Sequence, residues 1–151
     1  MNNRYLYRAK RTDNGEWVEG YLVETRHNTY HDGYRIIDKN GINYDELDYY
    51  EPSFISYVID KTTICQCTGL KDKNGKLIWE NDVVCTPYVD PIFGDIVNDE
   101  ILDDYTWKVV FVDGGFCVEN EDKIINLRSF TNGNHIKAIG NIFDNPELLE
   151  K

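Results

Sequence analysis

The sequence lacks a long apolar run, because none of its hydrophobic segments approaches the roughly 18–20 residues that a membrane span needs. Its first residues, Met1 to Arg11, alternate Tyr, Leu and Ala with Arg and Lys, which is not the pattern of an export leader. We therefore expect a soluble protein in the cytoplasm of the cell that makes it, with no membrane partner. In that reducing compartment four free thiols and no disulfides are expected, at Cys65, Cys67, Cys85 and Cys117.

Basic side chains are few and unevenly placed. The chain has 16 Lys and Arg against 27 Asp and Glu, a formal net charge of −11. Residues 1–80 carry 11 basic and 13 acidic side chains, a net −2, whereas residues 81–151 carry 5 and 14, a net −9. Such a field repels phosphate, so it disfavours nucleic acid as a partner and favours a basic protein. One alternative remains open, that the protein is an acidic mimic of DNA.

The motifs of common enzyme classes are also missing. No GxSxG, P-loop, GxGxxG, HExxH or calcium-loop pattern is present, and the serines number three, Ser53, Ser56 and Ser129. We therefore expect no enzyme activity, no catalytic residue and no cofactor, and an uncharacterised enzyme ranks third among the functions considered.

What the sequence does contain is alternation of apolar and polar side chains with a period of two, broken by turns that contain glycine. This pattern predicts antiparallel strands. Hairpins are expected over residues 4–23, around Asp13-Asn14-Gly15, and over residues 34–44, around Asp38-Lys39-Asn40-Gly41. Further strands are expected over residues 54–59, 62–67, 77–79, 83–88, 107–112, 116–119, 124–130 and 135–143. This spacing predicts an all-β fold with minor α content, in which residues 62–145 form a small SH3-like or related β-barrel with the N-terminal hairpins packed on it.

Three segments interrupt the strand pattern. Residues 45–52 fit a short helix or an irregular excursion equally well. Residues 87–106 are interpreted as an insertion, whose apolar side chains at i, i+4 and i+8 predict a short helix over residues 98–105. Asn145-Pro146-Glu147 predicts one helical turn near the end.

The length of 151 residues suits a single globular unit. Subdomains over residues 1–60 and 61–151 are the alternative.

Cysteine and histidine side chains are candidate metal ligands. Cys65 and Cys67 are expected two positions apart on one strand, so that both sulfurs face the same side. They could bind zinc with Cys85 or Cys117. Buried thiols that act as small apolar side chains are the preferred interpretation. His27 and His31 would share a metal only on a helix, and their surroundings predict a loop.

Two groups of charged side chains are candidate binding sites. The acids of the insertion could gather a cation, but they lack the ligand spacing of a calcium loop, so a solvated acidic face is preferred. These acids are Asp95, Asp99, Glu100, Asp103 and Asp104. Arg4, Arg8 and Lys10 are expected on one face of the first strand, where they could touch phosphate. Cross-strand pairs with Glu16 and Glu19 are the preferred interpretation for these cations.

Two stretches carry a family resemblance. The first is Thr68-Gly69-Leu70-Lys71-Asp72-Lys73-Asn74-Gly75-Lys76-Leu77-Ile78-Trp79-Glu80-Asn81-Asp82-Val83-Val84. It is similar to the central signature of the YopX family of phage and prophage proteins. The second is Ile139-Gly140-Asn141-Ile142-Phe143-Asp144-Asn145-Pro146-Glu147-Leu148-Leu149, which is similar to its C-terminal signature. The resemblance implies a phage-encoded accessory protein without an assigned activity, acting as a homo-oligomer and through contacts with a host or phage protein.

The chemistry of the signature residues predicts a structural role for them. Gly69 and Gly75 permit turns, Glu80 and Asp82 can accept backbone N–H groups at a strand corner, and Gly140 allows close approach. The family pattern usually has glycine where this chain has Asn81, which predicts a left-handed backbone there, since Asn tolerates positive φ best after Gly. The structural signature comprises Thr68, Gly69, Leu70, Asp72, Gly75, Trp79, Glu80, Asn81, Asp82, Gly140, Asn141, Asn145 and Pro146.

Overall fold

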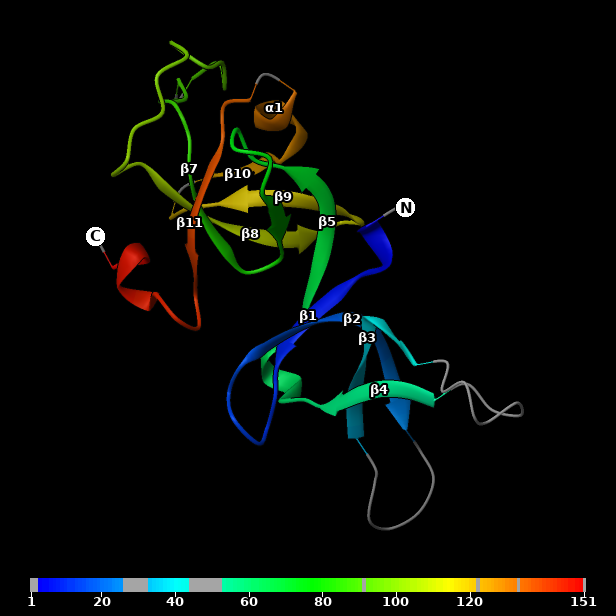
Figure 1. Ribbon diagram of the computed structural model, residues 1–151. Coiled ribbons are helices and arrows are strands. Elements are labelled where there is room, and N and C mark those ends of the chain that lie inside the picture. Colours follow the sequence, from blue (N-terminus) through cyan, green and yellow to red (C-terminus); the bar gives the residue numbers. More distant parts are fainter. Residues whose placement is uncertain are drawn as a thin grey trace. The chain divides into compact units, whose positions relative to one another are not determined.

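The computed structural model (Figure 1) describes residues 3–25, 33–43, 53–90, 92–121, 123–132 and 134–150. The chain divides into two compact units, Met1–Cys67 and Thr68–Lys151. This boundary lies seven residues after the one considered from the sequence. The segment 45–52, with its helix-or-excursion alternative, falls outside the described residues, as does Tyr44.

The first unit is an antiparallel sheet with the strand order β4-β3-β2-β1-β5. Its elements are η1 (Asn3–Tyr5), β1 (Tyr7–Lys10), β2 (Trp17–Thr25), β3 (Gly33–Asn43), β4 (Ser53–Val58), η2 (Lys61–Thr63) and β5 (Cys65–Lys71). The first hairpin prediction is confirmed: β1 pairs with β2 across a turn in which Gly15 has φ 72°. Alternation places Ala9, Ile36 and Ile59 inside, each buried, and half-buried neighbours such as Val18 and Leu22 pack against them.

The second hairpin prediction is wrong, because β3 continues through the expected turn. Ile37 pairs with Ser56 and Ile42 pairs with Phe54, so residues 38–41 form a bulge opposite a single residue of β4. The turn chemistry is present, since Asp38 Oδ1 accepts the Asn40 N–H at 2.7 Å. It bends the strand locally without reversing it.

The second unit holds a five-stranded antiparallel sheet with the order β10-β9-β8-β7-β11. Its elements are β6 (Leu77–Trp79), β7 (Asp82–Cys85), β8 (Thr106–Val112), β9 (Gly115–Glu119), β10 (Ile124–Asn126), α1 (Arg128–Thr131), β11 (Lys137–Asn141) and η3 (Pro146–Leu149). The second half of β5, from Thr68, belongs to this unit and neighbours β6. The hairpin of β8 and β9 confirms the turn expected at Asp113-Gly114-Gly115.

All-β architecture is confirmed, but the SH3-like barrel is not, because neither sheet closes on itself within the described residues. A barrel requires its first and last strands to pair. Here β10 and β11 are the two edge strands of one sheet and do not pair with each other. β10 is three residues long and is followed by α1. The strand expected over residues 124–130 ends at Asn126, and α1 follows it. Leu127 and Phe130 are three positions apart and both are buried in the core, as the spacing of a helix allows. Among the described residues, no helix is long and apolar enough to cross a membrane.

The helix expected over residues 98–105 is absent from this described stretch. Within this stretch Leu102 N–H donates to the distant Thr86 carbonyl at 3.1 Å, and just before it Val97 N–H donates to the Tyr88 carbonyl at 3.1 Å. Tyr105 N–H donates to the Leu102 carbonyl at 3.1 Å, which makes a single turn. Asn98 Oδ1 also accepts the Glu100 N–H at 3.0 Å, a turn that competes with a helix. By contrast, the helical turn expected at Asn145-Pro146-Glu147 is confirmed as η3, with Pro146 in its first turn.

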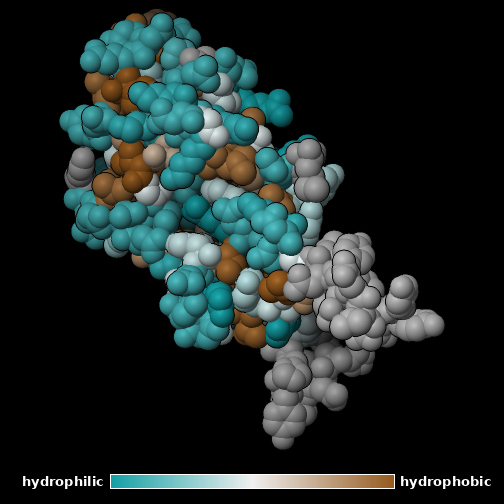
Figure 2. Space-filling view, viewed as in Figure 1, coloured by the Kyte–Doolittle hydropathy of each residue, from teal (hydrophilic) through white to brown (hydrophobic). Residues whose placement is uncertain are grey.

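The core of the second unit is a cluster of nine buried apolar side chains. They are Ile78, Val84, Val89, Trp107, Val109, Val118, Leu127, Phe130 and Ile136. Trp107 is central, because its ring lies 5.1 Å from Tyr105 and 6.3 Å from Phe130, and its indole N–H donates to Thr86 Oγ1 at 2.8 Å. Figure 2 shows the remaining apolar surface on the viewed face as separate brown patches among hydrophilic surface.

Candidate functional site

The edge strand β4 carries an exposed apolar surface in the first unit. The side chains of Phe54, Ile55 and Val58 are 55%, 37% and 47% exposed. The end of the strand is covered, since Thr12 N–H donates to the Val58 carbonyl at 3.1 Å. Alternation then directs the backbone groups of Ser56 and Phe54 to the same outer side, where no described backbone group meets them. This edge can accept another strand.

Two arginines border this edge. A crevice of about 250 Å³ lies beside β4, lined by Arg11, Thr12, Asp13, Arg35, Ser56, Tyr57 and Val58. The Arg11 guanidinium lies 4.5 Å from the centre of the Tyr57 ring and pairs with the Asp13 carboxylate. That hydrogen bond raises the pKa of Arg11 and lowers the pKa of Asp13. Arg35 Nε donates to Ser56 Oγ at 3.1 Å, so these side chains form a polar rim next to the apolar edge.

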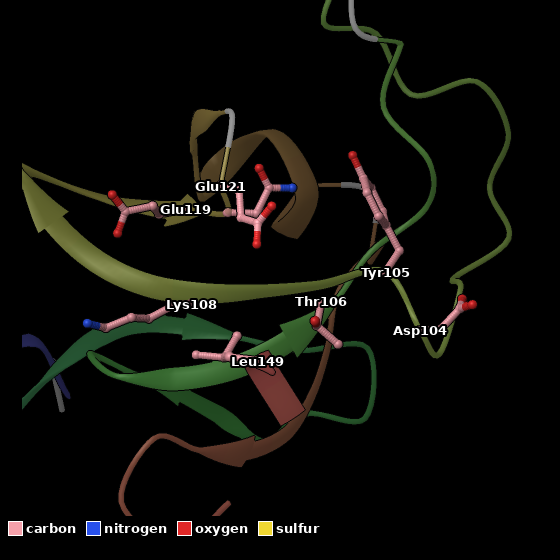
Figure 3. A pocket seen from close by; sticks show the side chains of 8 residues that line it. Asp104, Tyr105, Thr106, Lys108, Glu119, Glu121 and Leu149 are labelled. Carbon is pink, nitrogen blue, oxygen red and sulfur yellow. The ribbon is translucent and has the colours of Figure 1, made fainter. Parts of the chain in front are cut away.

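A pocket of about 540 Å³ lies in the second unit (Figure 3). It is lined by Asp104, Tyr105, Thr106, Lys108, Glu119, Asn120, Glu121 and Leu149. Lys108 and Glu119 are cross-strand partners on β8 and β9, and Tyr105 stands at the other end of the pocket. The lining has three carboxylates, one amine and the hydroxyls of Tyr105 and Thr106, and it contains no Ser, Cys or His. The arrangement suits a cationic group better than an acyl or phosphoryl substrate.

Tyr105 does not supply a base to this pocket. Burial raises the pKa of its hydroxyl, and the neighbouring Tyr88 raises it further. The two rings lie 5.7 Å apart. The phenol therefore stays protonated at neutral pH and serves as a hydrogen-bonding wall.

The central signature residues form a hydrogen-bonded turn. Asp72 is 3% exposed, and its Oδ1 accepts the N–H groups of Asn74 and Lys76, both at 2.9 Å. Its Oδ2 accepts the Ala138 N–H at 3.1 Å, so this side chain ties the turn to β11. Gly75, at φ 80°, closes the turn as expected.

The strands on either side of this turn are tied by Thr68. Its hydroxyl donates to the Ile78 carbonyl at 2.7 Å and accepts the Leu70 N–H at 3.1 Å. Gly69 between them has φ 75°, a positive value that its lack of a Cβ permits. It lies within β5 and does not reverse the chain.

The corner between β6 and β7 confirms the expected left-handed residue. Asn81 has φ 66°, and its backbone bonds on both sides: its N–H donates to the Val109 carbonyl at 2.9 Å and its carbonyl accepts the Ile142 N–H at 3.1 Å. Asp82 is 3% exposed and accepts the Trp79 N–H at 2.9 Å, as expected for a strand corner. Glu80 is half-buried at the same corner.

The C-terminal signature forms a second compact turn. A Cβ placed on Gly140 would lie 2.4 Å from Asn145 Oδ1, which confirms the close approach expected there. Asn145 Oδ1 accepts the Asn141 N–H at 3.3 Å, and Asn141 Oδ1 accepts the N–H groups of Phe143 and Asp144, both at 3.0 Å. Asn145 thus does not cap η3 with its side chain, although Pro146 begins that helix.

The N-terminal cations lie over an aromatic ring that the sequence interpretation overlooked. Arg8 Cζ is 4.8 Å and Lys10 Nζ 5.4 Å from the centre of the Trp17 ring. Register could have identified this contact, because the turn at Asp13-Asn14-Gly15 places Trp17 opposite Lys10. Arg4 does not share the strand, because it lies in η1. Glu19 pairs with Lys39 on β3, and Glu16 Oε2 accepts a hydrogen bond from the Asn14 amide at 3.1 Å.

The thiols occupy interior positions. Cys65, Cys67 and Cys85 are 0% exposed, and Cys117 is partly buried. Cys65 Sγ donates to the Thr63 carbonyl at 3.3 Å and Cys85 Sγ to the Asp103 carbonyl at 3.4 Å. In the part of the chain that the structure describes, no group of three or more metal-ligating side chains comes together.

Two acids of the connection between β7 and β8 form isolated pairs with His135 and Lys137. His27 and His31 lie outside the described residues. His135 Nε2 lies 3.6 Å from Asp99 Oδ1, and Lys137 Nζ lies 3.3 Å from Asp103 Oδ1. These exposed carboxylates are spread along the connection between β7 and β8 and do not surround one point.

Comparison with known proteins places the chain in a family. The sequence profile described as YopX protein matches residues 6–150. The crystal structure of protein EF1440 from Enterococcus faecalis is similar over 95% of this chain and 96% of that one, with a TM-score of 0.54 and 24% sequence identity, which shows a shared fold. No curated protein matches. Because the profile covers nearly the whole sequence, this chain belongs to the YopX protein family.

Proposed function

We propose that this protein is a phage or prophage accessory protein that acts in the host cytoplasm through protein contacts and self-association, and not through catalysis. The observation that carries the proposal is the outer edge of β4, where apolar side chains are exposed and no described backbone group bonds to Phe54 or Ser56. Family membership supports the phage origin. The pocket of the second unit supports a non-catalytic role, because its lining has no Ser, Cys or His and the Thr106 hydroxyl donates to the Leu148 carbonyl at 3.2 Å.

The geometry of β4 suggests how two copies join. An antiparallel pair of β4 strands centred on Ile55 would place Phe54 of each copy opposite Ser56 of the other. Each such pair exchanges two backbone hydrogen bonds, because the outward groups of β4 belong to these residues. Ile55 would then face its own symmetry mate, which is the self-complementary contact of a two-fold dimer.

A backbone substitution tests the strand pairing. Ser56→Pro removes an N–H that points away from β3, so the sheet of the monomer keeps its bonds. We expect the wild-type chain to sediment as an oligomer at high micromolar concentration and Ser56→Pro to sediment as a monomer. Ser56→Ala is the matched control, since it loses the hydroxyl but keeps the N–H. A monomeric wild-type chain would refute self-association.

A cysteine substitution tests the register. Facing residues of a non-hydrogen-bonded antiparallel pair have Cα atoms about 4.5 Å apart, within disulfide reach. Ile55→Cys, made in a Cys117→Ser background, should therefore form a covalent dimer on oxidation, seen on a non-reducing gel. Phe54→Cys in the same background should not. Equal cross-linking at both positions would exclude the proposed register.

Nucleic-acid contact is the weaker alternative. The cations considered for it, Arg8 and Lys10, lie over Trp17, and Arg4 lies in a separate helical turn. The three side chains therefore do not form the single basic stripe that phosphate binding would use.

A further inference from the structure

The connection between β7 and β8 contains a small hairpin, described for residues 88–90 and 92–97, which we call the apolar hairpin. Figure 1 shows this connection, in yellow-green, extending from the sheet of the second unit. Its two arms are joined by the bridge between Val89 and Ile96, and Asp90 N–H donates to the Asp95 carbonyl at 2.8 Å. Val89 is 1% exposed, and Ile96 packs against the core cluster. The base of the hairpin is therefore anchored.

The tip of the apolar hairpin presents two large side chains to solvent. Ile92 is 81% and Phe93 76% exposed, the highest values among the large apolar side chains of the described residues. Asp90 Oδ1 accepts the N–H groups of Ile92 and Phe93 at 2.7 and 2.9 Å, and Gly94 N–H donates to the Asp90 carbonyl at 2.9 Å. The turn thus holds both side chains outward before any partner binds. Such preorganisation lowers the entropy cost of binding.

The sequence around the tip is acidic, and one cation from another segment, Lys123, lies close enough to Asp90 to act on its charge. Residues 88–105 contain six Asp and Glu and no Lys, Arg or His. Asp99 and Asp103 pair with His135 and Lys137. The other acids past the tip have no ion pair within the described residues. They are Asp95, Glu100 and Asp104. A surface that meets this hairpin would need positive charge around an apolar centre.

We propose that the apolar hairpin inserts Ile92 and Phe93 into an apolar pocket of a protein partner whose rim carries lysine or arginine. The inference rests on the proposed role in protein contacts and names the partner's chemistry. Exposed apolar side chains at the centre of a contact, with polar groups around them, are the usual anatomy of a protein interface. A second copy of this chain is a poorer occupant, because residues 81–151 carry a net charge of −9. An anionic bilayer would be repelled for the same reason.

The test uses the full chain as bait in a clarified lysate of the host bacterium. A protein retained by the wild-type chain is identified, purified and titrated against the variants by calorimetry. Ile92→Ser/Phe93→Ser should weaken binding by at least about 30-fold, the loss expected from removing a hot spot. Ile124→Ser is the matched control, because Ile124 is 54% exposed on β10, outside the hairpin, and it should bind as the wild type does. Folding of each variant is checked by thermal melting, where surface changes shift stability by about 0.5 kcal/mol or less.

Salt tests the charge of the rim. Binding of the wild-type chain should weaken towards about 1 M salt, where the screening length falls to about 3 Å. The variant Asp95→Asn/Glu100→Gln/Asp104→Asn should bind more weakly at low salt and lose that dependence.

Several results would overturn the inference. The inference falls if the retained protein binds the Ile92→Ser/Phe93→Ser variant as tightly as the wild type. It also falls if binding does not depend on salt, or if no protein is retained whose binding depends on the tip. The loss of oligomers in the tip variant would indicate a second copy as the occupant, and tip-dependent binding to phosphatidylcholine vesicles would indicate a lipid surface. If self-association through β4 persists when tip-dependent binding fails, the inference alone falls. If Ser56→Pro and the wild type are also both monomeric, the proposed function falls with it.

Discussion

The two units of this protein differ in what fills their interiors. Among the described residues, the second unit buries a nine-residue apolar cluster that includes Trp107 and Phe130, whereas the cluster of the first unit consists of Ala9, Ile36 and Ile59. The buried polar residues Asp72 and Asp82 also belong to the second unit.

This difference bears on which unit carries the stability. Most buried polar side chains of the second unit, with the exception of Thr86, lie in the two stretches that resemble the family signatures, so these stretches form a hydrogen-bond framework. Among the described residues, the apolar cluster of the first unit has three members, and apolar side chains along β4 are exposed. We infer that stability depends mainly on the second unit and that changes to β4 affect association more than folding.

The largest expected effect comes from the centre of the second unit. Trp107→Ala removes a ring that is 0% exposed and leaves the Thr86 hydroxyl without its indole donor. We expect a loss of about 3–5 kcal/mol in the free energy of unfolding, measured by urea denaturation. Phe111→Ala, at a ring that is 50% exposed on the same strand, should cost much less. Similar losses for both would contradict the idea that this cluster dominates stability.

Asp72 should come next, because one side chain serves three backbone amides. Asp72→Ala leaves the partly buried Ala138 N–H without its acceptor, and we expect a loss of roughly 1–3 kcal/mol. Asp72→Asn is the sharper variant, since its amide can serve the turn or Ala138 with an oxygen, but not both. It should lie between wild type and Asp72→Ala in chemical denaturation. Wild-type stability in both variants would show that the buried carboxylate does not hold the turn to β11.

A smaller effect is expected at Asn81, where the backbone lies in the left-handed region. A β-branched residue is disfavoured there by roughly 1–2 kcal/mol, so Asn81→Val should lower the melting temperature. Asn81→Gly is the control, because glycine adopts this φ without a steric penalty. An unchanged melting temperature in Asn81→Val would refute the conformational explanation.

Local chemistry was readable from the sequence where the answer depends on a few neighbouring residues. The turns at residues 13–15, 72–75 and 113–115 follow from Gly, Asn and Asp alone, and the positive φ of Asn81 follows from the glycine that the family pattern usually has at that position. The fate of residues 38–41 does not, because a bulge and a reversal use the same Asp–Asn contact and the pairing with β4 decides between them. The helix expected over residues 98–105 did not form for a similar reason, since the Leu102 amide bonds to the Thr86 carbonyl and the Glu100 amide to the Asn98 side chain.

Sheet closure and the surface sites depend on still longer-range contacts. Strand spacing predicts strands but not whether the outermost two will meet, so the barrel could not be distinguished from an open sheet. Trp17 could have been found by following the register out from the first turn. The exposed tip at Ile92 and Phe93 could not, because only the buried base of the hairpin shows that these apolar side chains face outward.

The smallest expected effect concerns the order of the apolar hairpin rather than global stability. Hydrogen bonds from Phe93 and Ile92 lower the pKa of Asp90 below its ordinary value of about 3.9. A depressed pKa means that the ionised carboxylate favours the ordered turn. That contribution is fully present above about pH 4 and is lost as the pH falls through the depressed value. Amide resonances of Ile92 and Phe93 should therefore titrate together in acid, with a midpoint below about 3.9, the ordinary value of an aspartate, whereas Asp90→Ala should abolish the shared transition. A midpoint at that ordinary value would mean that the carboxylate does not hold the tip.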